Sequence, residues 1–326
     1  MKKARVLVAA DHRFSPLMTV AELLPEFEVA VEGSAGLLRK VQDADILIST
    51  VVPIDRKLIY AGNFGLIQQF GVGIDPIDVQ AATEAGVLVA RVPAKGCGNA
   101  TAVAEHALML MLALARRLPE AMERIQQGVL TQPLGMMLHG KTAVIVGLGD
   151  LGTAISILLK AFGMKVLATR ANPEKGLPHG ACVDRLGGND ELETMLGEAD
   201  FVILSLSYSP QTRHFFDAQK IAATKPGAFL INVARGGVLE TEALTAALAS
   251  GQIAGAGLDV FDPEPVDPSL PLFRYNVIAT PHTAGFTDVS VRGICRLLAD
   301  NIRRYQAGEM PLHTVNNPLS IRRKAS

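Results

Sequence analysis

Three polar side chains in the second half of the chain each follow an apolar segment. Arg235 lies in INVARGG, Glu264 in GLDVFDPEP and His282 in ATPHTAG. The apolar segments have the length and composition of buried strands. Because the carboxyl ends of parallel strands meet at one edge of a sheet, these side chains are expected to converge there. A guanidinium, a carboxylate and an imidazole in one place suit acid–base chemistry on a substrate that carries a carboxylate.

Reduction of a 2-oxo acid needs this combination. Hydride addition to a carbonyl leaves negative charge on oxygen, so a proton donor is required, and a histidine beside a carboxylate is readily protonated near neutral pH. This predicts His282 as the donor and Glu264 as its partner. Arg235 is predicted to bind the substrate carboxylate bidentately and to polarise the carbonyl. Asp259 is expected to accept from a nicotinamide carboxamide and orient the ring.

A glycine-rich segment that could hold the hydride carrier is GLGDLG, Gly147–Gly152. It stands between a strand-like apolar run and the helix-like TAISILLKAFG, which is the context of a dinucleotide-binding loop. The first glycine permits a tight turn, Gly149 admits a pyrophosphate close to the backbone, and Gly152 allows the helix to pack on the strand. The helix N-terminus attracts the anion.

The cofactor preference is predicted from the end of the next strand. A chain that prefers NAD usually has an acidic residue there, which accepts from the ribose 2′-hydroxyl. This sequence has Thr169 and Arg170 instead. A guanidinium can donate to a 2′-phosphate and the threonine hydroxyl could donate to it too, so NADP(H) is predicted to be preferred, with NAD(H) possible.

The elements that must position these residues alternate between strands and helices, which predicts an α/β fold with two doubly wound parallel sheets. Strand patterns are found at 5–10, 27–31, 44–50, 65–70, 86–92, 141–146, 165–169, 199–206, 227–234, 253–260 and 276–280. A long helix is expected from Thr101 to Arg117, ended by Pro119. Residues 122–140 lack periodicity and are expected to form an exposed arm. A last helix over 289–305 is expected to return to the first domain.

Composition excludes several classes of protein. Net charge is −1 and the basic residues are scattered, which disfavours nucleic acid and anionic membranes as partners. The most apolar stretch, 106–115, is too short to span a bilayer, and no signal-peptide pattern is found at the N-terminus. Cys97, Cys182 and Cys295 lack metal-ligand spacing, so neither a metal site nor a disulfide framework is expected. A cytoplasmic location is expected.

An ordered set of segments resembles the D-isomer-specific 2-hydroxyacid dehydrogenases over nearly the whole chain. The segments are FGVGIDPIDVQAATEAGV, VAEHALMLMLALARR, GLGDLG, INVARGGVLETEAL, AGAGLDVFDPEP and TPHTAG. The resemblance implies a Rossmann cofactor domain, residues 101–285, inserted in a flavodoxin-like substrate domain formed by residues 1–100 and 286–326. It also implies a homodimer formed through the cofactor domain, with the 122–140 arm taking part.

The resemblance assigns the acid–base function to His282, with Glu264 as its partner, and substrate binding to Arg235. It implies that Val72 and Gly73 offer backbone N–H groups to the substrate carboxylate. The cofactor contacts that it implies are Gly147, Gly149, Asp150, Leu151, Gly152, Thr169, Arg170, Ser207, Pro210, Val233, Asp259 and Ala284.

The chain departs from the family pattern in two segments. LSLSYSPQT, which contains Ser207 and Pro210, lacks the histidine often found there. VPAKGCGNAT, with Lys95 and Asn99, replaces a commoner TPGANTES and disfavours a phosphoglycerate dehydrogenase.

Two other classes of protein share parts of this sequence pattern. A nucleotide-sensing interaction protein resembling the C-terminal binding corepressors would keep similar catalytic residues, but the neutral chain without long disordered tails favours the enzyme. A phosphite-type dehydrogenase is disfavoured because FGVGID contains no lysine.

Overall fold

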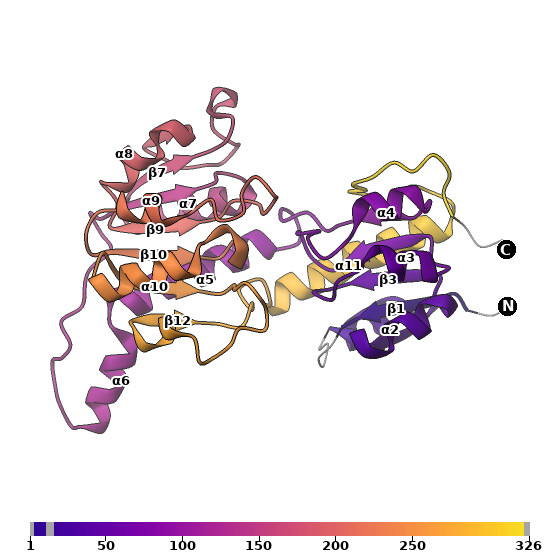
Figure 1. Cartoon of the computed structure of the whole chain (residues 1–326), viewed down its shortest axis with the longest axis horizontal. Helices are drawn as coiled ribbons and strands as arrows, with labels where there is room; N and C mark the ends of the chain where they lie inside the picture. Colours follow the sequence, from indigo (N-terminus) through magenta and orange to yellow (C-terminus); the bar gives the residue numbers. More distant parts are fainter. Residues whose placement is uncertain (1–2, 11–15, 323–326) are drawn as a thin grey trace. The chain divides into compact units, whose positions relative to one another are not determined.

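The computed structural model describes residues 3–10 and 16–322, which form two compact units (Figure 1). The first unit comprises residues 1–99 and 288–326, and the second comprises residues 100–287. These boundaries lie close to the expected ones at 100 and 286. Each unit is an α/β structure built on a parallel sheet, so the predicted fold class is confirmed. Which unit binds substrate and which binds cofactor stays a prediction at this point.

The sheet of the first unit has five parallel strands in the order β2-β1-β3-β4-β5, the flavodoxin-like order. The strands are β1 (Arg5–Ala9), β2 (Glu28–Glu32), β3 (Ile46–Ser49), β4 (Leu66–Gln69) and β5 (Leu88–Ala90). One face packs on α1 (Leu17–Leu23) and α11 (Asp288–Gln306), and the other on α2 (Ser34–Lys40), α3 (Arg56–Ala61) and α4 (Val79–Glu84). Both faces are apolar, as expected for a parallel sheet covered on both sides.

Helix α11 joins the C-terminal segment to the first unit. Ile294, Leu298 and Ile302 are buried in the same cluster as the residues of β1, β3 and β4 that face it. Asn301, also buried, donates to Gln68 Oε1 (2.9 Å). The expected return of this helix to the N-terminal sheet is therefore what the structure shows.

The sheet of the second unit has seven parallel strands in the order β12-β11-β10-β9-β6-β7-β8. They are β6 (Thr142–Val146), β7 (Lys165–Thr169), β8 (Arg185–Gly187), β9 (Phe201–Leu204), β10 (Ala228–Asn232), β11 (Ile253–Leu258) and β12 (Val277–Ala279). The strand order reverses between β6 and β9, and ligands of such sheets bind beyond the carboxyl ends of the strands at this point. Strand β8 was not predicted, because three residues including an arginine form no strand pattern.

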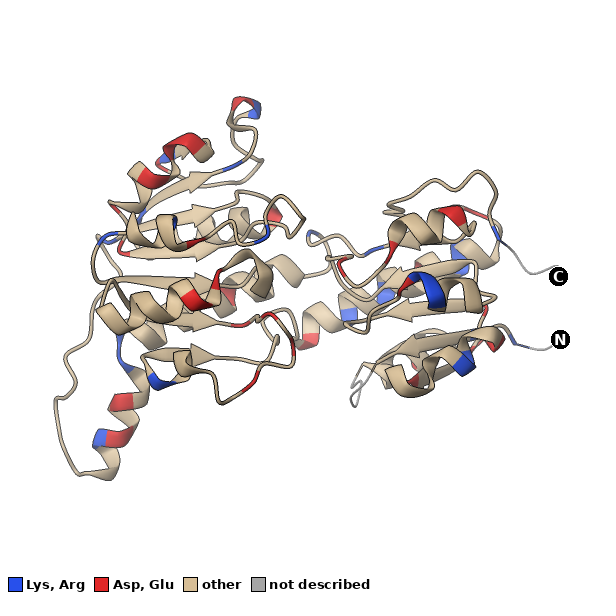
Figure 2. Ribbon diagram, in the orientation of Figure 1, with Lys and Arg blue, Asp and Glu red and all other residues tan. Residues whose placement is uncertain are grey.

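Helices cover both faces of the second sheet. Helices α5 (Asn99–Ala115) and α7 (Asp150–Ala161) share one buried cluster, and α8 (Leu192–Leu196), α9 (Ala218–Ala222) and α10 (Thr241–Ser250) share the other. A Cβ on Gly257 of β11 would lie 2.9 Å from Leu110 Cβ, so this glycine lets α5 approach the sheet closely. Figure 2 shows that charged residues of both signs lie mainly on helices and loops.

The long helix differs from its prediction. Helix α5 starts at Asn99, two residues early, and ends at Ala115, after which Arg117 has a left-handed φ of 51°. A separate helix, α6 (Leu118–Gln126), follows, with Pro119 in its first turn. Proline lacks an N–H and is pre-organised for the first turn, so Pro119 starts a helix here and does not mark the end of the previous one. The predicted arm is therefore helical up to Gln126 (Figure 1).

Candidate active site

The turn between β6 and α7 has the geometry of an anion-binding loop. Gly147 has a φ of +100°, and a Cβ there would lie 2.7 Å from Leu206 Cα. A Cβ on Gly152 would lie 3.1 Å from Ile145 Cγ2, so this glycine allows α7 to pack on β6. Around a Cβ on Gly149 there is no described atom within 4 Å. The backbone is thus open at the one glycine where a pyrophosphate would approach.

Helix α7 directs its N-terminus towards this open side. It begins at Asp150, and its N-cap residue, Gly149, has no side chain to cap the free N–H groups. The first N–H groups of an α-helix have no intrahelical acceptor and favour an anion. The N–H groups of Asp150, Leu151 and Gly152 are therefore available to a pyrophosphate, and the loop fits a dinucleotide.

The end of β7 contains Thr169 and Arg170. The Thr169 side chain is buried, and its Oγ1 has no hydrogen-bond partner among the described residues. Its carbonyl oxygen accepts from Gly147 N (3.1 Å) and thereby holds the glycine turn. Arg170 Nη1 donates to Gly176 O (2.6 Å). The structure brings Arg170, but not the hydroxyl of Thr169, to the surface of this edge.

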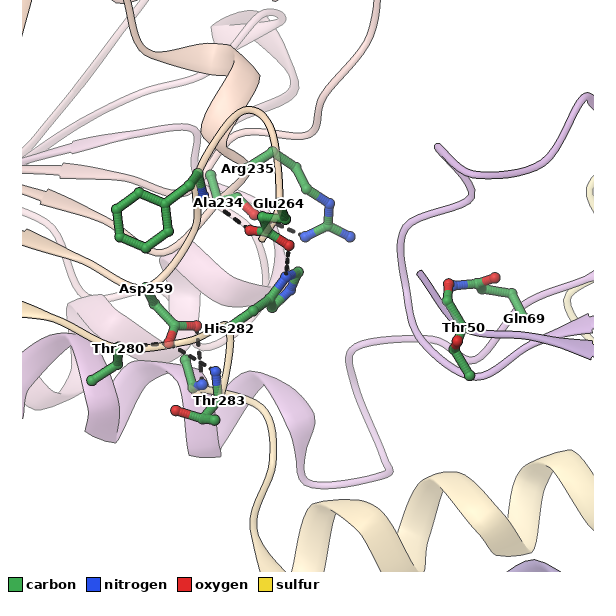
Figure 3. A network of polar contacts seen from close by, with 11 residues as sticks. Thr50, Gln69, Ala234, Arg235, Asp259, Glu264, Thr280, His282 and Thr283 are labelled. Carbon is green, nitrogen blue, oxygen red and sulfur yellow. Dashed lines mark hydrogen bonds and ion pairs between the residues drawn. The ribbon is translucent and has the colours of Figure 1, made fainter. Parts of the chain in front are cut away.

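Arg235, Glu264 and His282 come from loops that follow β10, β11 and β12, and Figure 3 shows them grouped together. His282 Nδ1 lies 2.8 Å from Glu264 Oε2, and Glu264 Oε1 accepts from Phe261 N (2.9 Å). Arg235 Nη1 donates to Ala234 O (2.8 Å). The convergence inferred from three strand ends is thus present within one unit.

The carboxyl group of Glu264 is ionised beside the imidazole of His282. Partial burial opposes its ionisation, but the hydrogen bond and charge of His282, the Phe261 N–H and the charge of Arg235 outweigh burial and lower the pKa of Glu264. Glu264 is therefore a carboxylate at neutral pH and can only accept a hydrogen bond. Nδ1 of His282 must carry the proton of this bond, which leaves Nε2 as the ring nitrogen that can exchange a proton with a substrate.

Asp259 holds the loop that contains His282. Its carboxylate is 2% exposed and accepts from Thr280 Oγ1 (2.6 Å), Thr283 N (2.8 Å) and Ala284 N (3.0 Å). Its carbonyl oxygen accepts from His282 N (2.8 Å), and His282 has a left-handed φ of +54°. Successive N–H groups that surround an anion in this way form a nest. The predicted contact of Asp259 with a nicotinamide stays a prediction, and so does that of Ala284.

The other predicted cofactor contacts lie at the same edge of the second sheet. Ser207 and Pro210 are exposed in the loop that follows β9, and Thr212 Oγ1 donates to Ser207 O (2.8 Å). Val233 follows β10 directly and is only 6% exposed. Their contacts with a cofactor stay predictions.

The first unit contains the predicted carboxylate-binding loop after β4. Within the described residues, the N–H groups of Val72 and Gly73 donate to no acceptor. Gln69 Nε2 donates to Thr50 O (3.0 Å), and Thr50 Oγ1 donates to Ala9 O (2.6 Å) (Figure 3). These bonds tie together the ends of β1, β3 and β4 beneath the loop.

Sequence reasoning missed several residues that shape the site. Asn232, fully buried at the end of β10, donates to Arg235 O (3.0 Å) and accepts from Ala234 N (3.1 Å). A Cβ on Gly236 would overlap the backbone of Phe261, so this glycine lets the two loops meet. The only sequence feature that could have indicated Asn232 and Gly236 is a polar or glycine residue close to the end of an apolar strand. Thr280 and His106 were also missed, because their contacts join distant parts of the chain.

Three further properties concern metal ligands, cysteines and membrane spans. No group of three or more histidine, cysteine, aspartate or glutamate side chains in residues 3–10 and 16–322 could hold a metal ion. All three cysteines are free, and burial raises the pKa of Cys295 to about 11. No helix in the described part of the chain is long and apolar enough to cross a membrane.

Comparison with known proteins places the chain in a family. The profile described as D-isomer specific 2-hydroxyacid dehydrogenase, NAD binding domain, matches residues 108–284. The glyoxylate reductase of Thermococcus litoralis is 37% identical, over 86% of each chain. The chain therefore belongs to the D-isomer specific 2-hydroxyacid dehydrogenase family, and its second unit contains an NAD-binding domain. The resemblance inferred from the ordered motifs is confirmed.

Two other relatives are named for different activities. The D-3-phosphoglycerate dehydrogenase of Methanocaldococcus jannaschii is 33% identical over 96% of this chain, which spans only 59% of that protein. The structure of an NADPH-dependent glyoxylate/hydroxypyruvate reductase from Sinorhizobium meliloti, in complex with NADP and malonate, matches with a TM-score of 0.83. It is 30% identical, and both chains are covered in full.

Proposed function

We propose that the protein is an NAD(P)-dependent oxidoreductase that interconverts a small D-2-hydroxy acid and the corresponding 2-oxo acid. The observation that carries the proposal is the grouping of Arg235, Glu264 and His282 in the unit that contains the NAD-binding domain. The first unit, with Val72 and Gly73, is proposed to bind the substrate carboxylate. Turnover of glyoxylate, hydroxypyruvate, pyruvate and 2-oxobutyrate with each reduced cofactor tests the proposal.

Each group of residues has a separate role in the proposed reaction. The 147–152 loop and the N-terminus of α7 would hold the pyrophosphate of a nicotinamide cofactor, which would supply or take up the hydride. Arg235 binds the substrate carboxylate and polarises the carbonyl. As the carbonyl carbon gains hydride, the C=O π pair moves to oxygen, which takes a proton from His282 Nε2. Glu264 holds Nδ1 throughout and balances the charge of the imidazolium. In the reverse direction His282 accepts the hydroxyl proton.

NADP(H) is the cofactor that we propose to be preferred. Arg170 stands where a carboxylate would grip the ribose diol of NAD, and its guanidinium, held by Gly176 O, can donate to a 2′-phosphate. The S. meliloti relative, described as NADPH-dependent, supports this choice. The buried hydroxyl of Thr169 does not add to the support. Comparing kcat/KM for NADPH and NADH tests it, and a preference for NADH would contradict it.

The proposed substrate is a small 2-oxo acid without a phosphate group, and glyoxylate and hydroxypyruvate are the first candidates. Two of the relatives are named as reductases of these acids, one of glyoxylate and one of glyoxylate and hydroxypyruvate. The loop that contains Lys95 differs from the pattern expected of phosphoglycerate dehydrogenases. Oxidation of 3-phosphoglycerate at a rate that matches D-glycerate would contradict this choice. If none of the panel is turned over, the nucleotide-sensing alternative is favoured.

A homodimer formed through the second unit is also proposed. Helix α6 has no buried residue, and its Leu118, Met122 and Ile125 share one face and are 48–72% exposed. The segment after it exposes Leu130 and Leu134 by 80% and 89%. Apolar side chains gathered in this way mark an interface, and a second copy of the chain is the proposed occupant. Light scattering should give a molar mass twice that of one chain. The Ile125→Glu variant should have the mass of a single chain.

We also propose a compartment and a class of partner for the protein. Three free cysteines are consistent with a reducing compartment, and we propose the cytoplasm. Charges of both signs are mixed along the chain (Figure 2), so we propose a small-molecule partner and do not propose nucleic acid as a partner.

A further inference from the structure

A chain of hydrogen bonds leads from helix α5 to the catalytic loop of the second unit. His106 Nε2 lies 2.8 Å from Thr280 Oγ1, and Thr280 Oγ1 donates to Asp259 Oδ1 (2.6 Å). The direct distance from His106 Nε2 to Asp259 Oδ1 is 3.6 Å, so the threonine hydroxyl is the link. His106 is 14% exposed, which limits access of water to these bonds.

The direction of these bonds follows from the number of hydrogens. A carboxylate only accepts, and the Thr280 hydroxyl has one hydrogen, which it gives to Asp259. Thr280 Oγ1 must then accept from His106, and His106 must carry hydrogen on Nε2. The imidazole therefore acts as the terminal donor of a chain that ends on a buried carboxylate.

The fold brings His106 to this place through the packing of α5. Leu110, four residues later on the same face of the helix, packs against Gly257 of β11. Because Gly257 has no side chain, α5 lies close enough to the sheet for His106 to reach Thr280, which directly follows β12.

Asp259 transmits this arrangement to the catalytic histidine. The carboxylate that accepts from Thr280 also accepts from the N–H groups of Thr283 and Ala284, and the carbonyl oxygen of Asp259 accepts from His282 N. These bonds maintain the left-handed backbone of His282, which is an uncommon conformation for a residue other than glycine. The carboxylate and the carbonyl oxygen of Asp259 together therefore hold the backbone from His282 to Ala284, and Glu264 holds the imidazole.

We infer that His106 and Thr280 are positioning residues for His282, acting through Asp259 without touching substrate. This inference rests on the proposed function, in which His282 transfers the proton. Loss of the Nε2 donor or of the Thr280 hydroxyl frees the Asp259 carboxylate to rotate and loosens the 282–284 backbone. The chemical step should then slow, while the glycine turn at 147–152, which belongs to other strands, should keep its structure.

The test compares apolar and hydrogen-bonding replacements at both positions. His106→Leu and Thr280→Val should each lower kcat roughly tenfold to a hundredfold, the range that corresponds to a hydrogen bond to a charged group. His106→Gln, which can keep the donor, and Thr280→Ser should recover most of kcat. The double variant should be no slower than the slower single variant, because either change interrupts the same chain. Thr245→Val on α10 is the matched control, since its hydroxyl bonds only within its own helix.

Amide hydrogen exchange supplies a readout that does not depend on turnover. The peptide that covers residues 280–286 should exchange faster in both apolar variants, with the rest of the second unit unchanged. Equal acceleration throughout the unit would show a loss of global stability and overturn the inference. Wild-type kcat in both apolar variants, with His282→Gln inactive, would overturn it and leave the proposed function standing. If wild-type enzyme turns over no 2-oxo acid, the proposed function fails, and hydrogen exchange still decides the positioning of the loop.

Discussion

Replacing His282 by glutamine should remove proton transfer while keeping the local hydrogen bond. The glutamine amide can still donate to Glu264, which lies 2.8 Å from the imidazole in the wild type. It cannot deliver a proton to the developing alkoxide. Loss of a general acid typically lowers kcat by about 10² to 10⁴, which is roughly 3 to 5 kcal/mol in activation free energy.

The effect on the free energy of unfolding should be smaller than the effect on kcat. The imidazole of His282 is 38% exposed, and partly exposed ion pairs contribute only about 0 to 1 kcal/mol. The strain of a φ of +54° is already present with histidine, so glutamine changes it little. A total loss of about 1 kcal/mol leaves a protein of this size folded.

Steady-state assays with saturating NADPH give kcat, and fluorescence titration gives the dissociation constant of the cofactor. The expected result is a large fall in kcat with an unchanged dissociation constant, because the glycine loop lies on different strands. A kcat near that of the wild type would refute the assignment of His282. So would a variant whose defect lies only in cofactor binding.

Three further predictions concern neighbouring charges. Arg235→Lys should lower kcat and raise the KM for the 2-oxo acid, because an ammonium cannot form a bidentate fork. If only the KM for the cofactor rises, Arg235 binds the nucleotide instead. Arg170→Asp should shift kcat/KM from NADPH towards NADH by at most about 3 kcal/mol, and an unchanged ratio would show that Arg170 does not contact the 2′-phosphate. The lowered pKa of Glu264 means that its ionisation stabilises the fold above its unfolded pKa of about 4.3, and that this stabilisation is lost as pH falls through the lower folded value. Urea unfolding at pH 7 and pH 3 should therefore show a larger loss in wild type than in Glu264→Gln, and equal losses would contradict this.

Apolar runs and strand ends predicted most of the fold. Each parallel strand in the second unit except β8 lies in a segment that is apolar on both faces, and the residue types after β10, β11 and β12 identified the catalytic group. Strand β8 and helix α6 were missed for local reasons. Three residues carry too little pattern to predict a strand, and Pro119 is compatible with either the end or the start of a helix.

The residues that position the catalytic group are not marked by a local sequence pattern. His106 and Thr280 are 174 positions apart, and a histidine in an apolar helix is compatible with many environments. Asp259 is predicted as a cofactor contact because the sequence places it at the correct edge, and that contact stays a prediction. A strand end does not specify which way a carboxylate turns. That choice is made by the N–H groups of the following loop, which become neighbours only after folding.

The packing of α11 on the first sheet has a consequence for the order of events during synthesis. Val6, Val8 and Leu66 share a buried cluster with Ile294 and Leu298, so one face of the N-terminal sheet is covered by residues that the ribosome adds more than 200 positions later. The intervening unit, residues 100–287, is contiguous and can complete its own core first. Until α11 emerges, the N-terminal strands expose an apolar face, which is the kind of surface that chaperones bind and that promotes aggregation. Nascent chains stalled before Asp288 should therefore have a folded second unit and a first unit that is readily digested by protease.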